Sequence, residues 1–90
     1  MKKAVITVLG QDRVGIIGRV CIAMSTHNIN IMDISQTIVG GYFNMVMVVD
    51  MTESNAAFGD VAESLDTIGE DMGLKIKIQD AKIFDAMYRV

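Results

Sequence analysis

The sequence predicts a single α+β domain with the element order β-α-β-β-α-β and one further short helix. Two observations indicate this class: short β-branched or alternating apolar stretches bounded by glycine, and two longer stretches with apolar residues at steps of three and four. The chain has 90 residues, 51% of them hydrophobic and none of them proline. A chain of this size has room for one modest core and for no second domain.

The first half of the chain predicts a strand, a helix and a hairpin. Residues 3–9 are short, rich in β-branched side chains and followed by glycine, which is typical of a strand. Apolar residues at helical spacing then fill 14–27. Residues 29–39 and 42–51 flank a Gly-Gly pair, which predicts two strands joined by a tight turn.

The second half predicts a helix and a strand. Residues 58–72 carry the most regular helical pattern in the sequence, and Ser54 or Asn55 is expected to cap its start. Gly73 is expected to end this helix in the left-handed conformation. Residues 74–79 alternate between leucine or isoleucine and polar residues, as in a strand with one buried face.

This order is that of ferredoxin-like folds, with a four-stranded antiparallel sheet in the order 4-1-3-2 and both helices on one face. We expect the domain to span residues 1–80 and residues 81–90 to form a C-terminal helical extension with Asp80 as its cap. The third strand is apolar on both faces. We therefore expect either residues 83–88 or another subunit to cover the helix-free face, so dimers could assemble further.

The second and fourth strands are the edges of this sheet. Lys75 and Lys77 discourage pairing at the fourth strand, whereas residues 29–39 contain no lysine, arginine or proline. We expect the second strand to pair antiparallel with the same strand of a second copy, giving a homodimer with one eight-stranded sheet. The residues expected along this dimer edge are Ile29, Ile31, Asp33, Ser35 and Thr37.

Composition argues against several classes of protein. The net charge of −3 provides no basic surface for nucleic acid. No stretch is long enough for a membrane span or a signal peptide, and the single cysteine, Cys21, indicates a reducing cytoplasm. Cys21 and His27 do not share a helix face, which argues against a catalytic dyad. A lone histidine makes no metal site, and no cofactor is expected.

The stretch Gly10 to Val20, GQDRVGIIGRV, is the main candidate for chemistry. It lacks the Lys-Ser/Thr pair of a phosphate-binding loop and the glycine spacing of a dinucleotide fingerprint. A loop that opens a helix leaves the amides of Val14, Gly15 and Ile16 available to an anion such as a carboxylate. A glycine-relaxed turn without a ligand is the alternative, and both interpretations stay open.

The loop GQDRVGIIGRV and the following NIMDISQ resemble the ACT domain, a small-molecule-binding regulatory module, and especially its short stand-alone members. The G-x-D-R-x-G-I pattern is also similar to the ACT segments of formyltetrahydrofolate deformylase and of the glycine-cleavage repressor. The resemblance covers Met1 to about Asp80. It implies the βαββαβ architecture, dimerisation, and an amino acid bound between subunits.

The resemblance also implies site residues. Asp12, Gly15 and Asn30 match ligand-contacting positions. Amides of Val14 to Ile16 would hold the ligand carboxylate, while Asp12 and the Asn30 oxygen would accept from its ammonium. Antiparallel pairing would bring Asn30 of one chain towards the loop of the other. Arg13 belongs to the same candidate loop, and in the alternative it pairs with Asp12 and neutralises it.

The sequence therefore predicts a non-enzymatic, homodimeric module that binds a small amino acid or related metabolite. The alternative is a ligand-free module that docks a separate enzyme or regulator. A third hypothesis, an enzyme, finds no set of catalytic residues in the sequence.

Overall fold

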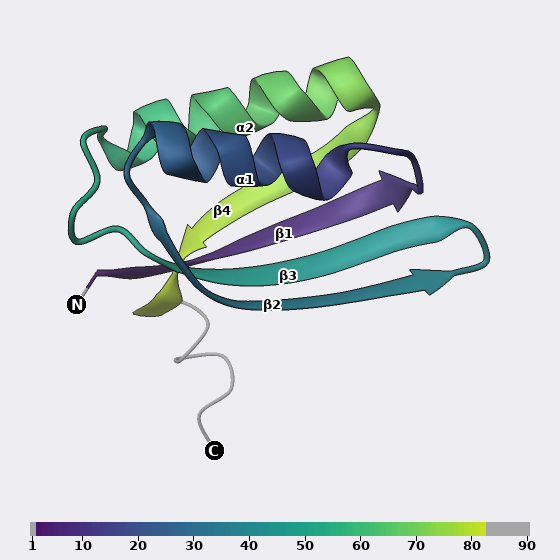
Figure 1. Ribbon diagram of the computed structural model, residues 1–90, viewed down its shortest axis with the longest axis horizontal. Coiled ribbons are helices and arrows are strands. Elements are labelled where there is room, and N and C mark those ends of the chain that lie inside the picture. Colours follow the sequence, from purple (N-terminus) through teal and green to yellow (C-terminus); the bar gives the residue numbers. More distant parts are fainter. Residues whose placement is uncertain (1, 83–90) are drawn as a thin grey trace.

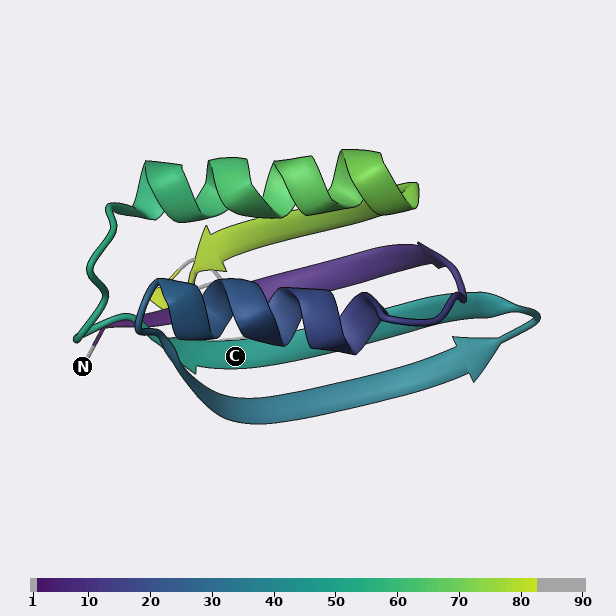
Figure 2. The same ribbon diagram turned by 45° about the horizontal axis from the view of Figure 1, so that its top comes forward.

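The structure, a computed structural model, describes residues 2–82 as one layer of four strands and one layer of two helices (Figure 1). The elements follow the predicted order: β1 (Lys3–Gln11), α1 (Ile16–Thr26), β2 (Asn30–Val39), β3 (Tyr42–Asp50), α2 (Phe58–Met72) and β4 (Leu74–Asp80). Both helices cover the same face of the sheet (Figure 2). The predicted ferredoxin-like class is confirmed.

The sheet has the strand order β2-β3-β1-β4, which is the predicted 4-1-3-2 seen from the other edge. All three neighbouring pairs are antiparallel. Because β1 and β2 are each antiparallel to β3, they run in the same direction. The loop after β1 and the start of β2 consequently lie at opposite ends of the sheet.

The core lies between the sheet and the helices. On β3, the buried side chains Phe43, Met45, Met47 and Val49 alternate with more exposed ones. Each helix adds one apolar stripe at steps of three and four. The buried stripe residues are Ile16, Val20 and Met24 on α1, and Val61, Leu65, Ile68 and Met72 on α2.

Glycines form the two sharp turns where the sequence predicts them. Gly40 and Gly41 have φ values of 58° and 82°, as the turn of a right-twisted hairpin requires. Gly73 ends α2 with φ 69°. These positions confirm the predicted turn between β2 and β3 and the predicted end of the second helix.

The predicted cap of α2 is wrong. The N-cap is Ala57, which has no side-chain cap hydrogen bond. The Ser54 hydroxyl accepts from the Ala56 amide at 3.2 Å, and the Asn55 side chain donates to the Thr26 carbonyl at 3.3 Å. Both polar side chains are therefore committed to the preceding turn and to the end of α1.

A bulge interrupts β2. The register against β3 shifts between Ile31 and Asp33, which opposes Ile31 to Val49 and Asp33 to Val48. Beyond the bulge, Ile34 and the alternate residues after it share the helix side of the sheet. The expected edge positions therefore divide: Ile31 lies on the helix side, whereas Asp33, Ser35 and Thr37 lie on the helix-free side. Ile29 precedes the strand and is buried.

The predicted C-terminal helix lies outside the described residues. At its expected start, the Asp80 carboxylate accepts the Lys82 amide at 2.8 Å, which is the hydrogen bond of a helix cap.

Candidate functional site

A backbone hydrogen bond fixes the position of the loop between β1 and α1. The Asp12 amide donates to the Gly41 carbonyl at 2.9 Å, which fastens the loop to the β2–β3 turn. Gly15 adopts φ 93°, a conformation that side-chain-bearing residues rarely adopt. The chain thus turns at this glycine and enters α1, a geometry that both interpretations of the loop share.

The first turn of α1 presents backbone amides without a side-chain acceptor. Gly15 is the N-cap, and no side-chain cap hydrogen bond or acidic first-turn residue is found there. Ile16 is buried in the core and fixes the helix start, whereas the Val14 side chain is almost fully exposed. The amides at this end carry the positive end of the helix dipole, so the site favours an anion.

A small groove of about 260 Å³ adjoins this helix start. It brings together most of the predicted loop residues with one side of the β2–β3 hairpin. The groove is lined by Asp12, Arg13, Gly15, Ile16, Ile17, Gly18, Gln36, Ile38 and Phe43. Val14 is not among these residues, so its expected contribution is limited to its backbone.

Arg13 does not neutralise Asp12. Its guanidinium donates to the Met72 carbonyl at 3.3 Å, across to the end of α2. Within residues 2–82, the ion pair found is between Arg19 on α1 and Asp71 on α2. The Asp12 carboxylate is therefore not paired with its neighbour.

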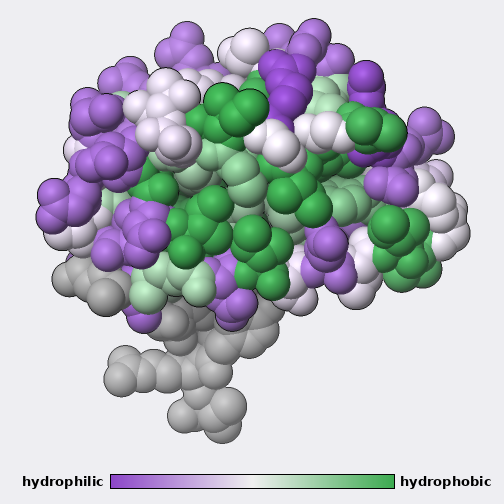
Figure 3. Space-filling model, in the orientation of Figure 1, coloured by the Kyte–Doolittle hydropathy of each residue, from purple (hydrophilic) through white to green (hydrophobic). Residues whose placement is uncertain are grey.

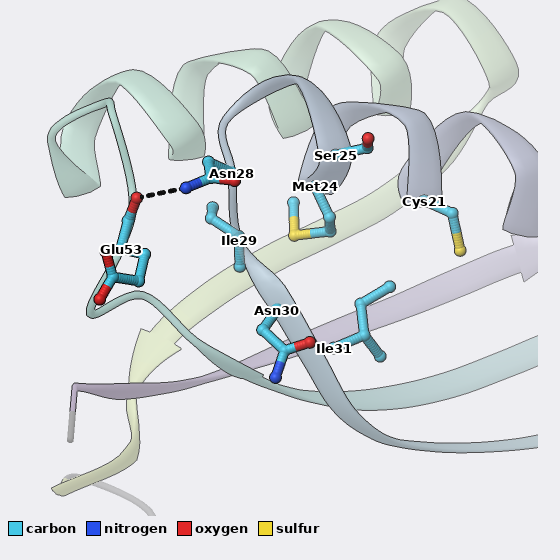
Figure 4. Close-up of a pocket in the computed structure, with 8 residues that line it drawn as sticks. All are labelled: Cys21, Met24, Ser25, Asn28, Ile29, Asn30, Ile31 and Glu53. Carbon is cyan, nitrogen blue, oxygen red and sulfur yellow. Dashed lines mark hydrogen bonds between the residues drawn. The ribbon is translucent and has the colours of Figure 1, made fainter.

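Asn30 lies in a second, larger groove of about 510 Å³ at the opposite end of α1 (Figure 4). The groove runs between the second half of α1, the start of β2 and the loop after β3. Its lining residues are Cys21, Met24, Ser25, Asn28, Ile29, Asn30, Ile31 and Glu53. The Asn28 side chain donates to the Glu53 carbonyl at 2.9 Å, which joins two sides of this groove. A single chain therefore does not bring Asn30 to the loop.

The sequence does not indicate several of the residues that line the two grooves. Gln36 and Ile38 reach the small groove because the bulge sets which side of β2 faces the helices, and Phe43 reaches it from the buried side of β3. Among the described residues that line the larger groove, Glu53 is the one with a charged side chain. It follows β3 in a turn, and no spacing in the sequence relates it to Asn30.

Asp50 ends β3 in register with Asn30. Its carboxylate accepts the Thr52 hydroxyl at 2.6 Å and the Thr52 amide at 2.9 Å. These hydrogen bonds, the hydroxyl first, lower the pKa of Asp50 below its ordinary value of 3.8. The charged form of Asp50 at the end of β3 is thereby favoured.

The other sequence candidates have structural contacts. His27 Nε2 lies 3.0 Å from the Ser64 hydroxyl oxygen and links the end of α1 to α2. Cys21 is a free, half-buried thiol against the core. The described residues contain no group of histidine, cysteine and acidic side chains that could hold a metal. None of the helices in residues 2–82 is long and apolar enough to cross a membrane.

Apolar side chains remain on the surface beside both grooves. Figure 3 shows them gathered over α1 and β2. Ile22 on α1 and Ile34 and Ile38 on β2 are exposed. The helices thus leave the β2 side of the sheet incompletely covered.

Comparison with known proteins agrees with this architecture. The family model of the ACT domain matches residues 2–79. A UPF0237 protein of Bifidobacterium longum is 51% identical over 90 residues, which cover 100% of each chain. The structure of an ACT domain protein from Streptococcus pneumoniae is 39% identical with a TM-score of 0.80, and the match covers 97% of this chain and 98% of that one.

Two further structures share the fold. A formyltetrahydrofolate deformylase from Pseudomonas syringae is 23% identical with a TM-score of 0.82, over 89% of this chain and 28% of that one. A putative glycine cleavage system transcriptional repressor is 25% identical with a TM-score of 0.73, over 87% of this chain and 44% of that one. The resemblances expected from the loop motif are confirmed. The chain belongs to the ACT-domain family, whose members are regulatory ligand-binding modules.

Proposed function

We propose that this chain is a cytoplasmic, non-enzymatic regulatory module that forms a homodimer through β2 and binds a small amino acid at the subunit interface. One observation carries the proposal: β2 is an edge strand whose helix side stays exposed. Ile34 and Ile38 are 40% and 61% exposed although they face the helix layer. A second copy of the same edge would cover these side chains and pair the open strand.

The directions of the strands support a composite site. Antiparallel pairing of β2 about a two-fold axis would set the end of one β2 beside the start of the other. The small groove lies near the end of β2, and the larger groove lies at its start. The loop of one protomer would then face the partner's Asn30, and two equivalent sites would result.

The charges of this composite site suit a zwitterion. The uncapped amides at the start of α1 would hold a carboxylate. Asp12, which does not pair with Arg13, and the partner's Asn30 oxygen would accept from an ammonium group.

Calorimetric titration with the twenty amino acids tests this proposal. We expect one or a few to bind, and we expect Asp12→Ala or Asn30→Ala to weaken binding about tenfold or more, the equivalent of one charge-assisted hydrogen bond. Glu63→Ala on α2 and Asn44→Ala on β3 are the matched controls, because both residues are exposed and line neither groove. Absence of any binder, or unchanged binding by the site variants, would contradict the proposal. A protein partner retained by the Asp12→Ala/Asn30→Ala variant would then favour the ligand-free docking module.

A further inference from the structure

A protruding apolar side chain and a groove lie at opposite ends of β2. Ile38, near the end of the strand, is 61% exposed although its side chain lies on the helix side of the sheet. The larger groove, of about 510 Å³, lies beside the start of the strand and is lined by residues of α1, so it opens on the same side. One edge strand therefore carries both features on one face.

The larger groove is apolar where it passes between α1 and β2. Cys21 on α1 and Ile31 on β2 are both half-buried and pack against the core, and Met24 in the same groove is 1% exposed. In Figure 4 the Cys21 sulfur is directed towards β2, where Ile31 rises from the strand. Asn28 and Glu53 lie at the other end of the groove and are joined by a hydrogen bond. An apolar side chain that enters between α1 and β2 would thus meet apolar atoms.

The register of β2 indicates where Ile38 would lie in a homodimer. β2 pairs with β3 at nine positions between Asn30 and Val39, with one extra residue at the bulge. When two copies of β2 pair antiparallel over this full length, the second position of one strand opposes the eighth position of the other. These positions are Ile31 and Ile38, and both side chains lie on the helix side. Ile38 would therefore stand opposite the partner's Ile31, beside the partner's larger groove.

We propose that Ile38 of each protomer inserts into the larger groove of the other protomer and packs against Cys21 and Ile31 there. This inference rests on the proposed dimer through β2 and adds the side-chain contact that fixes its register. Insertion removes the apolar surface of two exposed isoleucines per dimer from water, which favours association. The larger groove would then belong to the dimer interface, and the ligand would be confined to the small groove and the Asn30 of the other protomer.

Methyl NMR on a mixed dimer tests this contact in the unaltered protein. Ile31 and Ile38 are six paired positions apart along one strand, a distance of about 20 Å. A nuclear Overhauser effect between their methyl groups can therefore arise only between protomers. In a sample that mixes two differently labelled forms, we expect such effects from Ile38 of one protomer to Ile31 and Met24 of the other. Their absence in a sample that sedimentation shows to be dimeric would overturn the inference but not dimerisation. A protein that stays monomeric would overturn the proposed function as well.

Truncation of Ile38 tests the contribution of the contact to dimerisation. Ile38→Ala should raise the dimer dissociation constant about tenfold or more, because each dimer loses two buried side chains. Leu9→Ala on β1 is the matched control, since Leu9 is also exposed but lies on the helix-free face of an inner strand. This control should change the constant by less than about twofold. In an Ile31→Ala background, Ile38→Ala should have a much smaller effect, because the two side chains contact each other across the interface. An equal effect in both backgrounds would overturn the insertion of Ile38 beside Ile31.

Discussion

The two edge strands of the sheet face the helix layer very differently. On β4, Leu74 and Ile76 are buried beneath α2, and Lys75 and Lys77 project from the other face. On β2, the residues on the helix side are largely exposed, and the strand carries no lysine. The lysines of β4 thus discourage pairing at that edge, whereas β2 is an open edge strand with exposed apolar side chains and no lysine.

The largest difference between the two edge strands should be in the free energy of unfolding when an isoleucine is truncated. Ile76→Ala on β4 should lower the free energy of unfolding by about 2–5 kcal/mol, because it leaves a cavity under α2. Ile38→Ala on β2 should cost about 0.5 kcal/mol or less in dilute monomer, because its side chain is already in solvent. Urea denaturation followed by circular dichroism measures both, and equal losses would remove the distinction.

Substitutions at one glycine of each helix test how closely α2 and α1 pack against their surroundings. A Cβ on Gly69 of α2 would lie 2.7 Å from the Leu74 carbonyl oxygen, whereas a Cβ on Gly18 of α1 meets nothing within 4 Å. Gly69→Ala should therefore destabilise by about 1–3 kcal/mol. Gly18→Ala should stabilise by about 0.5–1 kcal/mol through helix propensity. Thermal unfolding midpoints should shift in opposite directions, and a shift in the same direction would contradict this packing.

A lysine placed on β2 should give this strand the protection that β4 has. Ile34→Lys should raise the dimer dissociation constant at least about tenfold, because each dimer gains two like charges at its interface. Ile78→Lys on β4 is the matched control and should leave the dissociation constant unchanged, although the fold loses stability. Sedimentation velocity across a dilution series measures both constants. An unaffected Ile34→Lys dimer would place the interface elsewhere.

The smallest effect concerns Asp50, beside the start of β2. Its folded pKa lies below the ordinary value of 3.8, so its stabilising contribution is present above that pH and is lost as the pH falls through the folded pKa. Thr52→Val removes the hydroxyl donor and should raise the pKa of Asp50 towards 3.8. A carboxyl titration by NMR measures the change. An unaltered pKa would show that the hydroxyl is not its main cause.

Much of the fold could be predicted because local patterns determine it. The regular apolar stripe of α2, the Gly40-Gly41 turn and the alternation in β4 each specify an element without reference to distant residues. The cap of α2 was mispredicted because Ser54 has a nearer partner in its own turn. Sequence spacing does not reveal which of two competing hydrogen bonds a hydroxyl makes.

The site was less predictable because it depends on pairing between strands. The bulge in β2 sets the face on which Gln36 lies and so brings Gln36 to the loop. A reading of the sequence that assumes strict alternation along the strand does not reveal the bulge. The loop residues Asp12 and Gly15 were found from their motif, and one groove gathers them. Asn30 lies in another groove of the same chain, so its proposed role depends on a second copy.

Amide hydrogen exchange along both edge strands tests the proposed interface most directly. As protein concentration rises, the outward-facing amides of β2 should become strongly protected, because a second β2 provides their acceptors. The outward-facing amides of β4 should stay rapidly exchanging at every concentration. Equal exchange along both edges in concentrated solution would contradict the pairing through β2.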